Sequence, residues 1–144
     1  MSTKQKRPRG LRNNNPLNLR IGNNWLGEVV NPTDHEFEQF QTLFYGCRAT
    51  FIVFRNYIRR HKCDTLRKFI SRWAPNSENN TRAYIMHVSR TMDIAPDAKV
   101  LRFEDKEQMI RLFNAMCEVE CGEIPCSPNE VKDISLAYDA SLTR

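Results

Sequence analysis

The sequence predicts an α+β fold in which helices predominate, with a short N-terminal β-hairpin region followed by about five helices. Asparagine and glycine are dense over residues 10–31, a composition typical of turns and short extended pieces. After Phe44 the apolar residues instead repeat at intervals of three and four, the spacing of amphipathic helices. The chain has 144 residues, 40% hydrophobic and 27% charged, which suits a single ordinary globular domain.

The N-terminal part divides into an arm and a hairpin. Residues 1–9 are basic and polar, which predicts a flexible basic arm, and residues 10–144 form the expected single domain. Leu17, Leu19 and Ile21 alternate with polar residues, as in a half-buried strand. A second strand is expected over residues 25–30, with a Gly-Asn-Asn turn at 22–24 between the two.

Five later segments are predicted to be helical. The clearest is the first, because Phe44, Cys47, Phe51, Phe54 and Ile58 form one apolar stripe. The other four carry similar stripes, bounded by side chains that favour helix starts and by proline or glycine near helix ends. The expected starts are Phe44, Asp64 or Thr65, Asn79 or Asn80, Asp105 and Asn129, and the ends are marked by Pro75, Gly122 and Leu142.

The formal net charge of +5 suits an anionic partner, although a solvated tail and a solvated helix face would give the same pattern. The five cysteines include no CxxC pair and the three histidines are scattered. We therefore expect reduced core thiols and neither a metal nor another cofactor. No apolar run approaches the roughly 20 residues that span a bilayer, and no signal peptide is evident, so we expect synthesis in the cytoplasm.

Three stretches of the sequence are distinctive in combination. They are RNNNPLNLR at residues 12–20, TDxxFxxF at 33–40 with GxRA at 46–49, and RWAPxxENNTxxYI at 72–85. In this order they resemble a family of phage and prophage structural, or virion-associated, proteins that is related to lysozyme-like muralytic domains. The resemblance covers residues 9–95. It implies a lysozyme-like single domain with a motif-bearing part at 10–95 and a helical C-terminal part at 96–144.

The resemblance implies a peptidoglycan-cleaving activity, that of a muramidase or a lytic transglycosylase. Such a glycosidase needs a carboxylic acid that protonates the leaving oxygen, and often a second carboxylate. The candidates within the resembling stretches are Asp34 and Glu78, with Glu28 and Glu36 as weaker ones. The neighbouring Trp73 could exclude water from Glu78. The alternatives are structural: Asp34 as a turn or cap residue, and Glu78 as a charge at a helix N-terminus.

Sugar recognition would require a second set of residues. Trp25 and Tyr84 could stack on sugar rings, and the amides of Asn13, Asn15 and Asn79 could bind N-acetyl groups. The alternative is again structural, because aromatic residues at helical spacing mostly pack in a core and asparagines shape turns.

A non-catalytic role on the same scaffold is the main alternative. Glucosaminidases and lytic transglycosylases take their acidic Glu from a helix before the Asn-rich loop, whereas residues 1–12 contain neither Asp nor Glu. The protein would then be a virion structural or cell-envelope-binding protein. In either case the expected partner is peptidoglycan or another anionic envelope glycan, with virion or secretion-system proteins as further candidates. The expected destination is the virion or the cell wall. The lack of a recognised motif disfavours nucleic acid as a partner.

Overall fold

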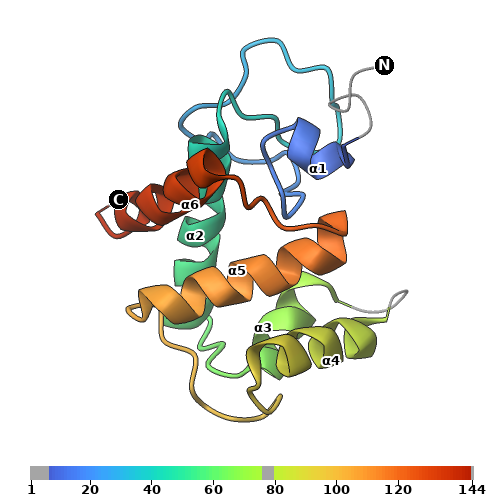
Figure 1. The fold of residues 1–144 in the computed structure, drawn as a ribbon, viewed down its shortest axis with the longest axis vertical. Helices are drawn as coiled ribbons and strands as arrows, with labels where there is room; N and C mark the ends of the chain where they lie inside the picture. The colour runs from blue at the N-terminus through green and yellow to red at the C-terminus, as the bar shows by residue number, and fades with distance from the viewer. Residues whose placement is uncertain (1–6, 76–79, 144) are drawn as a thin grey trace.

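The computed structural model describes residues 7–75 and 80–143, and over these residues every regular element is a helix (Figure 1). The helices are α1 (Arg9–Arg12), α2 (Leu43–Arg59), α3 (Leu66–Trp73), α4 (Thr81–Met92), α5 (Lys106–Cys121) and α6 (Pro128–Ser141). None of these helices is long and apolar enough to cross a lipid bilayer.

Helix α5 crosses the middle of the molecule. In Figure 1 the α3–α4 pair lies below it, and α1 with the rest of the N-terminal segment lies above it. α4, α1 and α6 all contact α5, α3 packs on α4, and α2 packs along α6. The core that α2, α3 and α5 share is aromatic. The ring centroids of Phe51 and Phe113 are 5.4 Å apart, and those of Phe54 and Phe69 are 5.0 Å apart. Each fully buried Phe contributes about 1.5–3 kcal/mol to stability.

The five helices expected from the apolar stripes correspond to α2–α6. Of the predicted caps, Thr65 and Asp105 are confirmed, whereas Asn80 precedes α4 without a side-chain cap hydrogen bond, and Phe44 and Asn129 lie inside α2 and α6. The side chains of Thr42, Thr65, Asp105 and Ser127 each accept a hydrogen bond from a backbone N–H in the first turn. Such a cap stabilises a helix by about 1 kcal/mol. Gly122 ends α5 in the left-handed conformation that favours glycine, with φ 77°.

The predicted β-hairpin region is absent from residues 7–75, so the α+β class is wrong and the fold is all-helical. Two isolated antiparallel bridges, Arg20 to Phe37 and Glu28 to Phe40, are all that remains of strand pairing there. The asparagines explain the difference. Asn14 and Asn18 adopt left-handed backbone (φ 56°), which interrupts an extended chain. The Asn15 side chain bonds the N–H and C=O of Leu19 and the C=O of Glu38, replacing strand-to-strand hydrogen bonds.

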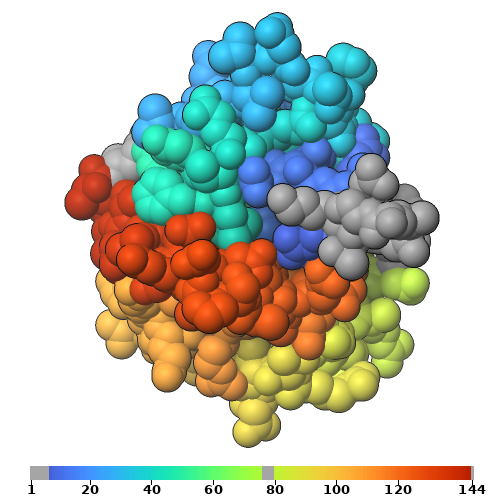
Figure 2. All heavy atoms as spheres, turned by 45° about the horizontal axis from the view of Figure 1, so that its top comes forward, coloured from blue at the N-terminus to red at the C-terminus, as the bar shows by residue number. Residues whose placement is uncertain are grey.

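The Asn-rich segment packs directly on α2 and α5. A Cβ added to Gly46 of α2 would lie 1.7 Å from the backbone oxygen of Asn14, so only glycine allows this approach. Residues 21–35 then leave the core and form the light-blue protrusion at the top of Figure 2. Leu26 and Val30 are 59% and 85% exposed on it. Residues 1–6, most of the predicted flexible arm, lie outside the described residues.

Candidate functional site

Asp34 lies in a dense network of hydrogen bonds at one edge of the protrusion. Its carboxylate accepts from Arg9 Nε and Nη2, both at 2.7 Å, and from Asn13 Nδ2 at 2.9 Å. The side chain is 7% exposed. The Arg9 guanidinium is the main reason that the pKa of Asp34 lies far below its usual range, against an opposing effect of burial. Asp34 is therefore ionised in the folded protein, and it fastens α1 to residues 33–37.

Of the three predicted asparagine ligands, Asn13 belongs to this network and Asn15 makes a separate set of hydrogen bonds. Asn13 donates to Asp34 and accepts from Gln39, and its side chain lines a surface hollow of about 720 Å³ together with Asp34 and Arg9. Asn15 is fully buried and all of its hydrogen bonds are to backbone groups. Both side-chain amides therefore stabilise the conformation of the N-terminal segment.

The remaining predicted residues fall in different places. Trp25 is half-buried in the protrusion, where its backbone N–H donates to Glu28. Burial and the nearby Glu28 raise the pKa of Glu38, a carboxyl that is 5% exposed. Glu36 is an exposed partner of Arg9 and Arg20. Glu78 and Asn79 lie outside the described residues.

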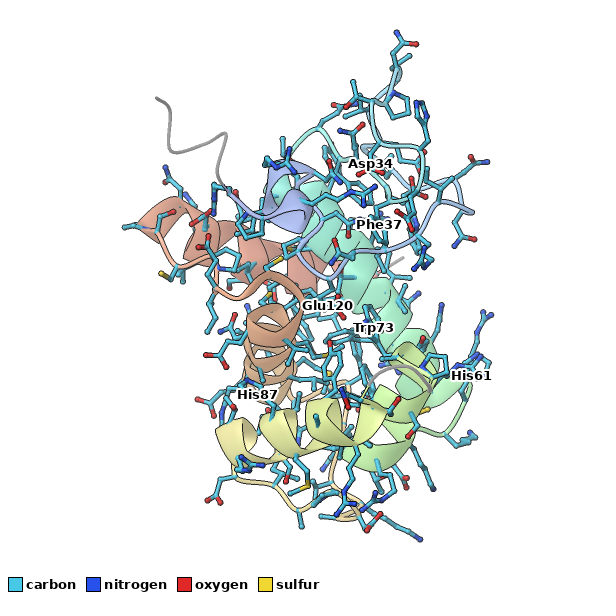
Figure 3. All side chains as sticks on the ribbon, turned by 90° about the vertical axis from the view of Figure 1, so that its right-hand side faces the viewer. Asp34, Phe37, His61, Trp73, His87 and Glu120 are labelled. Atoms are coloured by element: carbon cyan, nitrogen blue, oxygen red, sulfur yellow. The ribbon has the colours of Figure 1, made fainter. Side chains whose placement is uncertain are left out.

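A different carboxylate, Glu120 near the end of α5, has the surroundings of a functional group. It is half-buried, and each of its oxygens accepts one hydrogen bond. The Tyr84 hydroxyl of α4 donates to Oε2 at 3.0 Å, and Asn18 Nδ2 donates to Oε1 at 3.2 Å. Figure 3 places Glu120 beside Trp73, with Phe37 above and His87 below. Two segments distant in the sequence, those of Asn18 and Tyr84, thus hold the Glu120 carboxylate in place.

Two hollows meet at Glu120 and share Ala74. The first, the His87 hollow, measures about 420 Å³ and is also lined by Thr81, Tyr84, His87 and Glu118. The second, the Arg20 hollow, measures about 440 Å³ and is also lined by Asn18, Arg20, Phe37, Trp73 and Pro75. A smaller hollow of about 190 Å³ continues past Trp73 to Tyr57. The volumes of the first two hollows are in the range of small-molecule sites, and because Ala74 and Glu120 line both, the two form one groove across Glu120.

The electrostatics of the groove depend on three pairs. Burial, followed by the charge of Glu120, raises the pKa of Tyr84, which therefore remains an O–H donor. His87 Nε2 lies 3.0 Å from Glu118 Oε1. Arg20 lies over the Phe37 ring, 5.0 Å from its centroid, and its side chain remains 70% exposed. The groove thus presents a carboxylate at its centre, a cation on one side and a second carboxylate on the other.

Of the predicted site residues, Tyr84 lines this groove, whereas Asp34 and Asn13 line the separate hollow beside Arg9. Glu120 itself was missed by the sequence interpretation. The signal was present, because Glu120 continues the apolar stripe of α5 three residues after Cys117, where a core-facing side chain is expected. Among the described residues, no group of three or more His, Cys, Asp or Glu side chains is arranged to hold a metal ion.

Comparison with known proteins gives a phage relative. No protein-family model matches the chain. Protein P5 of Pseudoalteromonas phage PM2 is 35% identical over 128 residues, which cover 86% of this chain and 78% of that protein. The similarity therefore includes most of the segments that form the groove. At this identity and coverage, the chain belongs to the family of phage proteins that includes protein P5 of phage PM2.

Proposed function

We propose that the protein is a phage-type peptidoglycan-cleaving domain in which Glu120 donates the catalytic proton. The observation that carries this proposal is the position of Glu120: half-buried at the centre of a groove, with both oxygens oriented by Tyr84 and Asn18. A glycosidase needs a fixed carboxyl group in a groove that admits sugar rings. Trp73 supplies an aromatic wall on which such a ring stacks, whereas the Phe37 ring is covered by the guanidinium groups of Arg9 and Arg20.

The chemistry that fits one central acid is that of a lytic transglycosylase. Glu120 gives its proton to the glycosidic oxygen as the bond from the anomeric carbon to that oxygen breaks. A hydroxyl group of the same sugar then attacks the anomeric carbon, and its proton returns to the Glu120 carboxylate. A muramidase would use water instead of that hydroxyl. The other carboxylate of the groove, Glu118, is engaged by His87, which favours the route that needs a single acid.

Asp34 takes a positioning role in this proposal. A general acid must carry a proton, whereas the Arg9 ion pair keeps Asp34 ionised. Its hydrogen bonds fix α1 and the Asn-rich segment, and that segment presents Asn18 to Glu120. Glu78 remains a candidate from the sequence and is tested in parallel.

The test measures release of soluble fragments from purified peptidoglycan, with mass spectrometry of the products. Glu120→Gln keeps the shape of the side chain and should lower the rate by about 10²–10⁴-fold. Glu107→Gln is the matched control, because Glu107 is exposed at the other end of the same helix. Transglycosylase products lack the water that muramidase products contain, so their mass separates the two reactions.

Other outcomes are equally informative. Full activity in Glu120→Gln, with loss in Glu78→Gln or Asp34→Asn, would move the acid to one of those positions. A wild-type protein that sediments with the cell wall but releases no fragment would support the non-catalytic envelope-binding role. Circular dichroism of each variant verifies that it has folded.

A further inference from the structure

The two hollows that meet at Glu120 differ in charge. Among the described residues that line the Arg20 hollow, the charged one besides Glu120 is the cation Arg20. In the His87 hollow the corresponding charged residue is a second carboxylate, Glu118, whose Oε1 lies 3.0 Å from His87 Nε2. A chain of sugars lying across Glu120 would therefore meet a positive group on one side and a negative group on the other.

From this difference we infer that the groove discriminates between the sugars of a glycan by their charge. The carboxylate-bearing sugar lies in the Arg20 hollow and the neutral amino sugar in the His87 hollow. The inference rests on the proposed function, and it adds the register in which the strand binds. The ligand is a glycan whose sugars alternate between one with a carboxylate substituent and one without.

Arg20 has the geometry of a carboxylate-binding residue. Its guanidinium lies against the Phe37 ring, which limits its motion while its side chain stays open to solvent. Among the described residues it donates from Nη1 to Glu36 at 3.1 Å, which leaves other N–H groups of its five free for a ligand. Planar guanidinium groups bind carboxylates through two parallel hydrogen bonds.

The His87 hollow supplies the opposing effect. A carboxylate placed there would face Glu118, and like charges at close range are repelled. Attraction on one side and repulsion on the other fix which of the two sugars lies in which hollow. For the strand direction that the catalytic step requires, this register brings one of the two kinds of glycosidic bond to Glu120, so every product should end in the same kind of sugar.

The experiment uses peptide-free peptidoglycan glycan strands before and after their carboxyl groups are reduced to alcohols. Wild-type protein should bind the native strands about three- to tenfold more tightly, the range of one partly exposed charge-assisted contact. Arg20→Gln should bind native and reduced strands equally. Arg12→Gln is the control, since Arg12 is also exposed but lines the hollow beside Asp34, and it should keep the wild-type preference.

Product ends provide a second measurement. Mass spectrometry of wild-type products should show one kind of terminal sugar, and Glu118→Gln should produce a mixture. Equal binding of native and reduced strands by the wild type would overturn the inference while leaving the proposed function intact. Loss of the preference in Arg12→Gln as well as Arg20→Gln would also overturn it, as it would indicate non-specific attraction. Tighter binding of native than of reduced strands without any cleavage would refute the proposed function and would still support the inference that the groove discriminates sugars by charge.

Discussion

Replacing Asp34 with asparagine should destabilise the folded protein by about 2–3 kcal/mol at neutral pH. One carboxylate oxygen accepts from Arg9 Nη2 and from the backbone N–H groups of Glu36 and Phe37. The other accepts from Arg9 Nε and Asn13 Nδ2. The amide oxygen of an asparagine can accept the first set of hydrogen bonds. Its NH₂ group then replaces the second carboxylate oxygen and faces the two donors Arg9 Nε and Asn13 Nδ2, so two hydrogen bonds are lost.

The magnitude follows from those two lost bonds. A hydrogen bond to a charged group contributes about 1.5–3 kcal/mol, and breaking a buried ion pair costs about 3–5 kcal/mol. Arg9 is 46% exposed and partly regains water, so the lower part of that range applies. Urea unfolding followed by circular dichroism measures the difference. Glu36→Gln is the control: that side chain is 51% exposed, so its loss should lower the stability much less than Asp34→Asn does.

The effect should also depend on pH in a defined direction. The folded-state pKa of Asp34 lies well below the unfolded value of about 3.9, so the unfolded chain binds the proton first as the pH falls. The gap between wild type and Asp34→Asn should stay constant from about pH 7 to 5. It should shrink below about pH 4, by up to about 1.4 kcal/mol per pH unit. No gap at pH 7, or one undiminished in acid, would refute the assigned ion pair.

Three further predictions concern a close backbone approach, a buried phenol and the thiols. Gly46→Ala should cost more than about 2 kcal/mol because its Cβ would collide with the Asn14 oxygen, and an unchanged melting temperature would contradict that packing. Tyr84 should keep its proton through about pH 11, so Tyr84→Phe should show the same ultraviolet titration amplitude as wild type up to that pH. Cys126 is the exposed one of the five cysteines. A thiol reagent should therefore modify one group quickly in the native protein and five in denaturant.

The helices could be predicted from the sequence because their causes are local. The stripe through Phe51 and Phe54 and the caps at Thr65 and Asp105 act within one or two turns, and the observed helices begin next to them. The hairpin prediction failed for an equally local reason that period-two alternation does not reveal. Leu17 is buried as an alternating strand residue would be, at 1% exposure, but the asparagine side chains occupy the backbone groups that a partner strand would need.

The site was only partly predictable. The motif that contains Tyr84 led to a residue that lies in the groove, and its hydroxyl contacts the central carboxylate. Glu120 was missed because its other partner, Asn18, is 102 positions earlier in the chain. No periodicity relates residues at that separation. The packing of α1 on α5 brings them together, and that packing is a property of the folded whole.

The contact among Asn18, Tyr84 and Glu120 has a consequence for synthesis. A ribosome that has translated all three recognisable motif stretches, through residue 85, has not yet added the carboxylate on which two of their side chains converge. The nascent polypeptide thus contains all three motifs before the hydrogen bonds to Glu120 can form. A premature stop between residues 96 and 120 would yield a product that still bears the three motifs and lacks the carboxylate at the centre of the groove.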